Sequence, residues 1–309
     1  AAPDYFLLWG PPGTGKTSVM IREYVRYIFE ETEERLLLLA YTNRAVDEIC
    51  AAIESVRENM RDEYCRVGSR YSCGANYREQ LLEEKIKDVQ TRKDLIHKLK
   101  TQRIYVATLA SWYGKKDLQE ILSFDRVVID EASQILEPML AGILPDFKRF
   151  VLIGDHQQLP AVVTQSANES EVADPALIEL GLSNMRNSLF ERLYLLAQKN
   201  EWTWVYDQLK FQGRMHQDIM NFPNAHFYNF GLKTLPEEIP AHLRQLAPLP
   251  WQFSSNKLLG GQRVLFVPAE LDEESQGRKT NRKEAITIVA LLQSYLQLFE
   301  ECQYPLVAE

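Results

Sequence analysis

The stretch Gly10-Pro11-Pro12-Gly13-Thr14-Gly15-Lys16-Thr17 decides the fold, because it fits the phosphate-binding pattern G-x-x-x-x-G-K-[ST]. It follows residues 5–9, an apolar run that predicts a buried strand, and precedes residues 18–29, whose apolar positions predict a helix. Glycines let backbone N–H groups close around phosphates, while Lys16 reaches the β- and γ-phosphates and Thr17 offers a hydroxyl to Mg²⁺. The sequence therefore predicts a nucleoside triphosphate site at the amino end of a helix.

Length and composition favour a globular α/β protein with two domains. The chain has 309 residues, of which 45% are hydrophobic, and this is enough chain for two cores. The sequence contains no apolar span of about 18 residues and no secretory signal pattern, so we expect an intracellular, soluble protein. Its four cysteines form no C-x-x-C pair, which favours a reducing compartment and argues against structural zinc.

Charge is distributed unevenly along the chain. The net charge is −8 and the pI is near 5.4, which alone disfavours a nucleic-acid partner because phosphate contacts need clustered Lys and Arg. Residues 57–116, however, contain fourteen Lys and Arg against eight Asp and Glu, a local charge of +6 that leaves −14 for the remainder. This basic segment is either a solvated helix face or a surface that contacts nucleic acid, and charge alone leaves both open.

Short apolar runs alternate with helical patterns over the first part of the chain. Such alternation predicts a parallel sheet with ligands at the carboxyl ends of its strands. Residues 76–100 carry apolar side chains on one face of a long charged pattern and predict a stalk-like helix. The other predicted elements after the phosphate loop are strands at 36–40, 103–109, 126–129 and 150–153 and a helix at 45–53.

The remainder of the chain predicts part of a second domain. Helices are predicted at 188–198, 218–228 and 283–300, and strands at 202–206 and 262–268. A loop with a short helix at 175–180 is expected over 163–187, and a proline-rich surface segment over 232–256. We therefore predict a first domain over residues 1–200, with a basic stalk insertion at 55–105, and the amino-terminal part of a second domain over residues 201–309.

Two of the predicted strands end in polar groups that suit phosphate chemistry. Residues 127–129 are followed by Asp130, which would hold Mg²⁺, and by Glu131, which would orient and deprotonate the attacking water. Residues 151–153 precede a polar turn in which Gln158 is placed to hydrogen-bond the γ-phosphate. An Asp-Glu pair is common by chance, so its position downstream of a matching phosphate loop is what makes it informative.

The order and separation of these motifs resemble superfamily 1 helicases, in the 5′-to-3′ branch that contains the nonsense-mediated-decay helicases and the nuclease-helicases of Okazaki-fragment processing. The resemblance covers the chain from end to end and implies a P-loop NTPase with one RecA-like domain and part of a second. Besides the phosphate loop, it rests on Thr-Asn-Arg-Ala-Val-Asp at 42–47, Asp-Glu-Ala-Ser-Gln at 130–134, Gly-Asp-His-Gln-Gln-Leu-Pro at 154–160, Asn-Ser-Leu-Phe-Glu-Arg-Leu at 187–193 and Gln-Gly-Arg-Met-His at 212–216.

The resemblance implies an ATP and Mg²⁺ site with individual roles. Lys16 would grip the phosphates and Glu131 would act on the attacking water. Gln158 and Arg214 would contact the γ-phosphate, with Arg214 reaching from the second domain so that ATP closes the cleft. The implied ATP-binding residues are Gly10, Pro11, Pro12, Gly13, Thr14, Gly15, Lys16, Thr17 and Gln212, and the implied Mg²⁺ ligands are Thr17 and Asp130.

The resemblance also implies contacts to a single nucleic-acid strand. Small hydroxyl and amide side chains suit contacts that position a backbone without reading its sequence, and the implied contact residues are Thr42, Asn43, Thr108 and Ser111. The basic segment falls where the family inserts its stalk and strand-gripping subdomain. We therefore expect an ATP-dependent helicase or translocase that moves 5′ to 3′ on single strands, with DNA slightly favoured over RNA.

Two departures from the family pattern keep other functions open. Gly213 replaces the usual Tyr that stacks on the nucleotide base, so stacking would fall to Tyr41 or Tyr206, or base selectivity would be relaxed. The later motifs, including a second arginine finger, do not occur before Glu309, so we expect weak hydrolysis by this chain alone. The alternatives are an ATP-gated binding or scaffold protein without unwinding activity, and the motor part of a nuclease-helicase.

Overall fold

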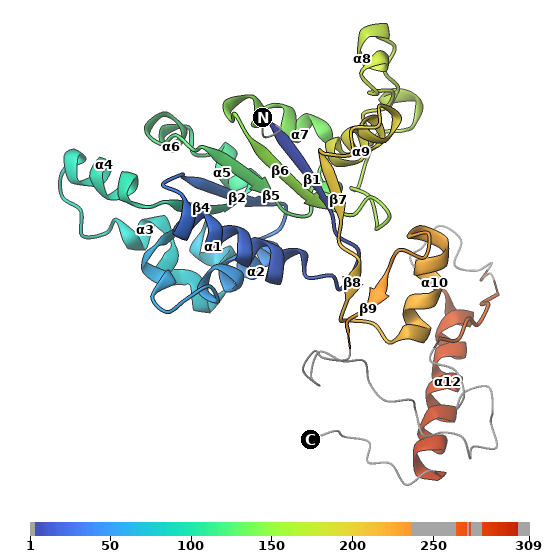
Figure 1. Cartoon of the computed structure of the whole chain (residues 1–309). Helices are drawn as coiled ribbons and strands as arrows, with labels where there is room; N and C mark the ends of the chain where they lie inside the picture. The colour runs from blue at the N-terminus through green and yellow to red at the C-terminus, as the bar shows by residue number, and fades with distance from the viewer. Residues whose placement is uncertain (1–3, 237–263, 271, 273–279, 302–309) are drawn as a thin grey trace. The chain divides into compact units, whose positions relative to one another are not determined.

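The computed structural model describes residues 4–236, 264–270, 272 and 280–301. The chain divides into two compact units, one of residues 1–214 with 231–234 and one of residues 215–230 with 235–309. The first unit contains the phosphate loop and all the strands of the large sheet. Figure 1 colours the chain from blue at the amino end to red at the carboxyl end.

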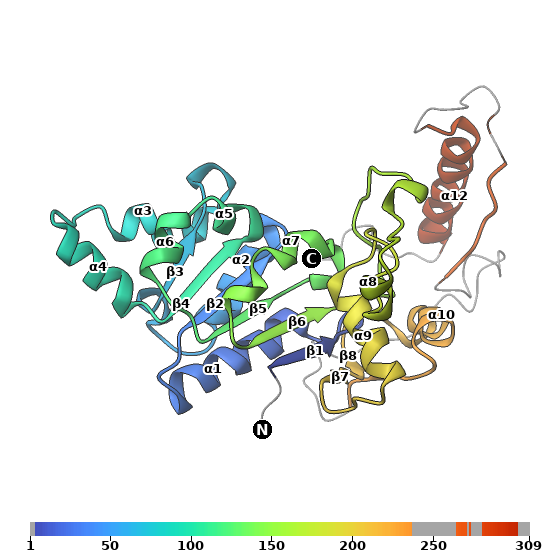
Figure 2. The same cartoon turned by 90° about the horizontal axis from the view of Figure 1, so that it is seen from above.

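The first unit is built on a seven-stranded sheet in the order β3-β4-β2-β5-β6-β1-β7. Every neighbouring pair in it is parallel, so all the carboxyl ends lie along one edge. The predicted α/β fold with a parallel sheet is thereby confirmed (Figures 1 and 2). The strands are β1 (Tyr5–Trp9), β2 (Leu36–Ala40), β3 (Tyr64–Val67), β4 (Ile104–Thr108), β5 (Arg126–Ile129), β6 (Phe150–Gly154) and β7 (Tyr206–Gln208).

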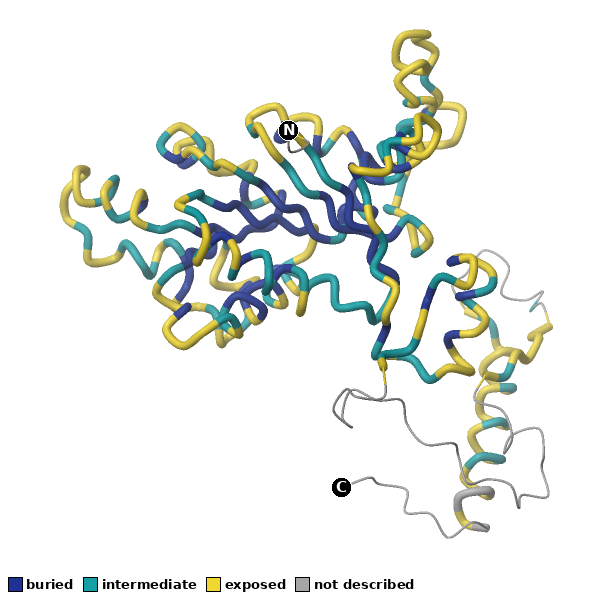
Figure 3. The backbone as a smooth tube through the Cα atoms, viewed as in Figure 1, coloured by how far each residue is buried: buried dark blue, intermediate teal, exposed yellow. Residues whose placement is uncertain are grey.

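Helices cover both faces of this sheet, as near-continuous apolar strands require. Every residue of β2 is buried, and the core around it appears as the dark band of Figure 3. A π-helical turn, Lys16–Ile21, leads into α1, which packs with α2 on one face; α5 and α7 lie on the other (Figure 1). The helices of this unit are α1 (Arg22–Glu31), α2 (Asn43–Glu54), α3 (Leu82–Lys85), α4 (Arg92–Thr101), α5 (Leu109–Tyr113), α6 (Lys116–Ile121), α7 (Glu137–Ala141), α8 (Pro175–Glu179) and α9 (Leu189–Lys199).

The predicted stalk helix over residues 76–100 is wrong. The structure has a 3₁₀ segment there, then the short α3 and the separate α4, which begins where the Thr91 side chain accepts a hydrogen bond from the backbone N–H of Asp94. The apolar spacing fitted one helix, but Thr91 followed three residues later by Asp94 is a capping pattern that starts a new one.

Strand β3 was also missed, because Arg66 lies in its middle. The Arg66 side chain is 1% exposed and pairs with Asp47 of α2, so the charge is neutralised inside the fold. As a result, part of the predicted insertion at 55–105 is the edge of the main sheet, parallel to β4. Several other basic side chains of this segment are paired too, including Arg61 with Glu54.

Two smaller strand predictions differ from the structure. The strand expected at 202–206 lies instead at Tyr206–Gln208, where it pairs with β1. Residues 264–268, the described part of the strand expected at 262–268, form no strand. The loop with a short helix over 163–187 is confirmed by α8, whereas most of the proline-rich segment lies outside the described residues.

The second unit contributes two helices to the described structure. They are α10 (Gln217–Phe227) and α12 (Arg282–Glu301), and both confirm the helices predicted at 218–228 and 283–300. The small two-stranded pair β8 (Phe211–Gln212) and β9 (Lys233–Thr234) belongs to the first unit. Among all the residues placed in the structure, no helix combines the length and apolar character needed to cross a membrane.

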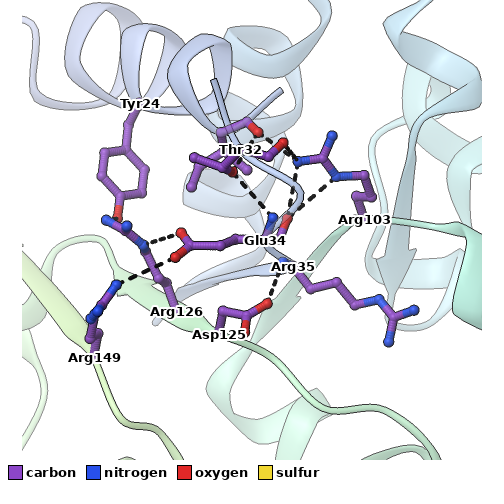
Figure 4. Close-up of polar contacts among 9 residues, drawn as sticks. Tyr24, Thr32, Glu34, Arg35, Arg103, Asp125, Arg126 and Arg149 are labelled. Carbon is purple, nitrogen blue, oxygen red and sulfur yellow. Dashed lines mark hydrogen bonds and ion pairs between the residues drawn. The ribbon is translucent and has the colours of Figure 1, made fainter. Parts of the chain in front are cut away.

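Charged side chains pair with one another at the amino ends of the strands (Figure 4). Glu34 accepts hydrogen bonds from Arg126 and, at 3.4 Å, from Arg149, while Arg126 also donates to the Tyr24 hydroxyl at 3.2 Å. Arg103 donates to the carbonyl of Thr32 at the end of α1. These charges at the amino edge of the sheet are therefore paired within the fold.

Candidate functional site

The phosphate loop adopts a conformation that needs glycine at three positions. Gly13 and Gly15 have φ values of 76° and 80°, in the left-handed region that side chains disfavour. A Cβ atom at Gly10 would lie 2.1 Å from Cγ of Lys16, so the lysine stem can fold back only over a glycine. The backbone N–H of Val19 donates to the Gly15 carbonyl, which starts the helix directly at the loop.

Residues 113 positions apart in sequence meet at this loop. The Thr17 hydroxyl donates a 2.6 Å hydrogen bond to Oδ2 of Asp130, and Nζ of Lys16 lies 3.6 Å from Oε1 of Glu131. Asp130 and Glu131 follow β5, and the backbone N–H of Asp130 donates to the carbonyl of Leu39 on the neighbouring strand β2. The two motifs read from the sequence thus form one cluster at the carboxyl edge.

Burial makes Asp130 a group that favours a bound cation. Its side chain is buried, and desolvation, opposed by the hydrogen bond from Thr17, raises the pKa of Asp130 to about 6. A divalent cation beside it would favour the ionised form, and a carboxylate with an adjacent hydroxyl supplies the oxygen ligands that Mg²⁺ prefers. Asp130 and Thr17 therefore fit the predicted metal site.

Glu131 is held in a strained backbone conformation. Its φ is 52°, which is uncommon for a residue with a side chain and is enriched at functional sites. The N–H of Glu131 donates to Oδ1 of Asp130, and Nε2 of Gln134 lies 3.4 Å from Oε2 of Glu131. These contacts fix the direction of the Glu131 carboxylate relative to the metal site.

Asp155 organises the third part of the site, a role that the sequence did not reveal. Asp155 is 1% exposed and accepts hydrogen bonds from the indole of Trp9 at 2.8 Å and from the side-chain amide of Gln158 at 2.7 Å. Its own N–H donates to the Ser133 hydroxyl. Asp155 thus ties Gln158 to the last residue of β1 and to Ser133, which follows β5. The only sequence signal for this role was the Gly-Asp turn.

The strand order explains why Gln158 lies between the phosphate loop and the acidic pair. Strand β6, which ends at Gly154, lies between β1 and β5, which carry the phosphate loop and the acidic pair. A Cβ atom at Gly154 would lie 2.8 Å from the backbone nitrogen of Ser133, so this close approach requires glycine. A side chain that follows β6 therefore lies beside both halves of the nucleotide cluster.

Arg214 lies beside the phosphate loop within the first compact unit, although the sequence placed it in a second domain. The N–H of Gly213 donates to the carbonyl of Gly13, and a Cβ atom at Gly13 would lie 2.5 Å from Cβ of Arg214. The fully buried side chain of Gln212 accepts a hydrogen bond from the Arg214 N–H. In the structure Gln212 thus holds the backbone of Arg214.

The four predicted strand-contact residues lie at the carboxyl ends of two neighbouring strands. Thr42 and Asn43 follow β2, Thr108 is the last residue of β4, and Ser111 lies in α5, directly after β4. Both threonines are helix caps, because Thr42 accepts a hydrogen bond from Ala45 and Thr108 accepts one from Ser111. Thr108 is buried, whereas Thr42 is exposed.

The structure brings neither candidate tyrosine to the phosphate loop. Tyr41 follows β2, which is separated from β1 by β5 and β6. Tyr206 pairs with Leu7 in the middle of β1 and stacks edge-on against Tyr194, with ring centroids 5.1 Å apart. Gly213 contacts the loop through its backbone, since its N–H donates to the Gly13 carbonyl at 3.0 Å.

Comparison with known proteins identifies the family to which the chain belongs. Two family models, each described as an AAA domain, match residues 1–102 and 76–166 and residues 185–306. The chain is 30% identical over 252 residues to the DNA replication ATP-dependent helicase/nuclease DNA2 of Saccharomyces cerevisiae, and 33% identical over 256 residues to that of Gallus gallus. These alignments cover 81% of the chain but 15% and 23% of the relatives.

The human relative gives a similar result. The DNA2 helicase/nuclease of Homo sapiens is 33% identical over 227 residues, which is 73% of the chain and 19% of that protein. The chain thus spans less than a quarter of the length of these three relatives. The two family models cover its phosphate loop and acidic pair as well as the Gln-Gly-Arg segment. The chain therefore belongs to the AAA-domain family of superfamily 1 helicases.

Proposed function

We propose that the protein is an ATP-dependent nucleic-acid helicase or translocase. The observation that carries this proposal is the single cluster in which Thr17 contacts Asp130 and Lys16 contacts Glu131, on the same sheet edge as Thr42 and its neighbours. An edge shared by a nucleotide site and a strand surface provides a direct route from hydrolysis to movement. The family and its relatives, which are DNA replication helicase/nucleases, support the same function.

ATP hydrolysis at this site would proceed by attack of water on the γ-phosphate. Bound Mg²⁺, held by Thr17 and Asp130, would neutralise the charge that develops on the phosphate oxygens. Glu131 would accept a proton from the attacking water, whose oxygen forms the new bond to phosphorus as the bond to ADP breaks. Lys16, 3.6 Å from Glu131, is placed to bind the phosphates beside this carboxylate.

Gln158 and Arg214 would detect the γ-phosphate from two sides. Asp155 accepts a hydrogen bond from Gln158 and another from Trp9. A movement of Gln158 on loss of the phosphate would therefore be transmitted through Asp155 to Trp9. Arg214 begins beside Gly13 and leads directly into residues of the second compact unit. Loss of the γ-phosphate would therefore release both contacts at once.

DNA is the strand we propose, with movement from 5′ to 3′. The relatives are named for DNA replication, and this favours DNA over RNA. Their names also include nuclease activity, but the chain matches less than a quarter of their length, so the nuclease is not carried over. Two alternatives remain: an ATP-gated binding protein that grips a strand without unwinding it, and the motor part of a nuclease-helicase.

Strand displacement tests this proposal. We expect ATP-dependent release of a labelled strand from a DNA duplex with a 5′ single-stranded tail, little release with a 3′ tail, and none with Lys16→Ala. Release from the 3′-tailed duplex alone would overturn the polarity. ATP-sensitive strand binding without displacement on either substrate would favour the binding-protein alternative and overturn the helicase function.

A further inference from the structure

The turn after β3 carries a fully exposed aromatic side chain next to the proposed strand surface. Tyr71 lies in the 3₁₀ turn Arg70–Ser72 and is 99% exposed. Large aromatic side chains usually bury most of their surface, so complete exposure at a defined turn is unusual. No motif read from the sequence includes this residue, because β3 itself was not predicted.

The backbone around Tyr71 is fixed although its side chain is free of the core. The Ser69 hydroxyl accepts a hydrogen bond from the Tyr71 N–H at 3.3 Å, and the Ser72 hydroxyl donates to the Ser69 carbonyl at 3.2 Å. The turn is anchored by two buried residues, Val67 before it and Cys73 after it. The backbone that carries the ring is therefore already ordered, so binding a strand costs little further backbone entropy.

The turn is connected to the neighbouring elements of the carboxyl edge. A Cβ atom at Gly68 would lie 3.9 Å from the Ser111 hydroxyl, so this chain passes beside a predicted strand contact. A Cβ atom at Gly74 would lie 2.8 Å from Oδ2 of Asp47 on α2, the helix that begins after Thr42. Tyr71 is three positions after Gly68, so their Cα atoms lie within about 11 Å of each other.

The charge around the turn suits a nucleic-acid strand. Arg70, in the turn itself, pairs with Glu84 at 2.8 Å but its side chain stays more than half exposed. Arg44, at the start of α2, pairs with Glu48 at 3.3 Å and is 90% exposed. Backbone phosphates attract such cations, and an aromatic ring beside them offers a surface on which any base can stack. An apolar protein partner would instead need several adjoining apolar side chains.

We propose that Tyr71 is a base-stacking platform for the single strand, placed beside the backbone contacts that follow β4 and β2. This inference rests on the proposed function, because it assigns a base contact to the same strand surface. Stacking on one ring tolerates any base, so the platform would hold a strand without selecting a sequence. Tyr71 is then a substrate-binding residue of the motor and takes no part in hydrolysis.

The test is the binding of a fluorescein-labelled oligothymidylate, followed by anisotropy with wild type, Tyr71→Ala and Tyr71→Trp. We expect Tyr71→Ala to weaken binding by about 5- to 150-fold, the range of one lost base stack, and Tyr71→Trp to bind like wild type. The matched control is Tyr27→Ala, on α1 and 47% exposed, which should bind normally. Thermal unfolding should be unchanged in Tyr71→Ala, since the ring touches no core residue.

Two further readouts separate stacking from charge. The salt dependence of binding should be unchanged in Tyr71→Ala, whereas Arg70→Ala should reduce its slope by about one. Oligonucleotides with one abasic site, moved along the strand, should reveal a position at which the abasic site weakens binding by wild type but has no further effect on binding by Tyr71→Ala.

If wild type binds and Tyr71→Ala binds equally well, the inference is overturned and the proposed function stands. If wild type binds no single strand at all, the proposed function fails and the inference fails with it.

Discussion

The carboxyl edge of the sheet has two halves that use opposite physical strategies. At the carboxyl ends of β1, β6 and β5, the nucleotide half has buried carboxylates, Asp130 and Asp155, and its polar side chains already contact one another, as Thr17 does with Asp130. Behind β3, β4 and β2, the strand half carries helix caps and exposed side chains such as Tyr71. The difference suggests how a motor can hold one ligand rigidly and let another slide.

The physical reason lies in what each ligand requires. Hydrolysis needs groups held in place before the reaction, because electrostatic stabilisation works best in a water-excluded, preorganised site. A strand that moves must be released at every step, so its contacts should be individually weak and sequence-independent. If this division is correct, changes in each half should affect one ligand and leave the other nearly intact.

The largest effect is expected from Glu131→Gln. Loss of the proton acceptor should lower ATP turnover by about 10² to 10⁴-fold, while single-strand binding changes by less than about 2-fold, because strand contacts lie in the other half. Steady-state phosphate release and anisotropy measure the two quantities. Glu34→Gln, at the self-paired amino edge, is the control and should leave turnover unchanged. Equal losses of turnover and strand binding in Glu131→Gln would remove the distinction between the halves.

Asp47→Ala should give the largest loss of stability in the strand half. It leaves the Arg66 side chain, which is 1% exposed, charged and without its partner, at a cost of about 3 kcal/mol. Urea unfolding measures this cost, and hydrogen exchange should place the opening in β3 and the Tyr71 turn. The double variant Asp47→Ala/Arg66→Met should recover much of the loss. Full stability in Asp47→Ala would show that the pair does not hold β3.

Thr42→Ala should have a moderate effect on two properties. Loss of the cap of α2 should cost about 1 kcal/mol of stability, and strand affinity should fall by a few-fold because the amino end of this helix is less well defined. Thr42→Ser keeps the hydroxyl and should behave like wild type. Strand affinity that drops without any loss of stability would mean that Thr42 acts by direct contact alone.

The smallest effect is expected from His156, which packs against Trp9 and Tyr194 at ring distances of 4.7 Å. Burial lowers the pKa of His156 below its ordinary value of 6.5, although Asp155 beside it opposes this shift. The folded state then binds fewer protons than the unfolded state, so stability should fall as the pH drops below about 6.5. Urea unfolding at pH 7.5 and 5.5 should show this loss in wild type and a smaller one in His156→Gln. An equal loss in both proteins would assign the pH dependence to other groups.

The nucleotide half was largely readable from sequence because its chemistry is local. Lys16 and Thr17 adjoin glycines that only a tight phosphate loop requires, and Asp130 and Glu131 directly follow an apolar run. The role of Asp155 was not readable, since it depends on the indole of Trp9, on the neighbouring strand β1, reaching the carboxylate that also binds the amide of Gln158. The position of Arg214 depends in the same way on a backbone contact to Gly13 that no local pattern encodes.

The strand half was harder to predict because its signals compete with others. Arg66 hid β3 by interrupting an apolar run, and its partner Asp47 lies on a different element. Thr42 and Thr108 have hydroxyls that serve equally as helix caps, so their residue types alone do not separate a structural from a binding role. Tyr71 could not be found until β3 placed Gly68, three positions before it, beside Ser111.

Stimulation of ATP hydrolysis by single-stranded DNA tests the central claim most directly, because it measures the coupling between the two halves. We predict that turnover rises with oligonucleotide concentration to a plateau in wild type. For Tyr71→Ala the same plateau should be reached only at higher DNA concentration, and for Glu131→Gln the plateau should be nearly abolished. Turnover that does not respond to single-stranded DNA in wild type would contradict the account.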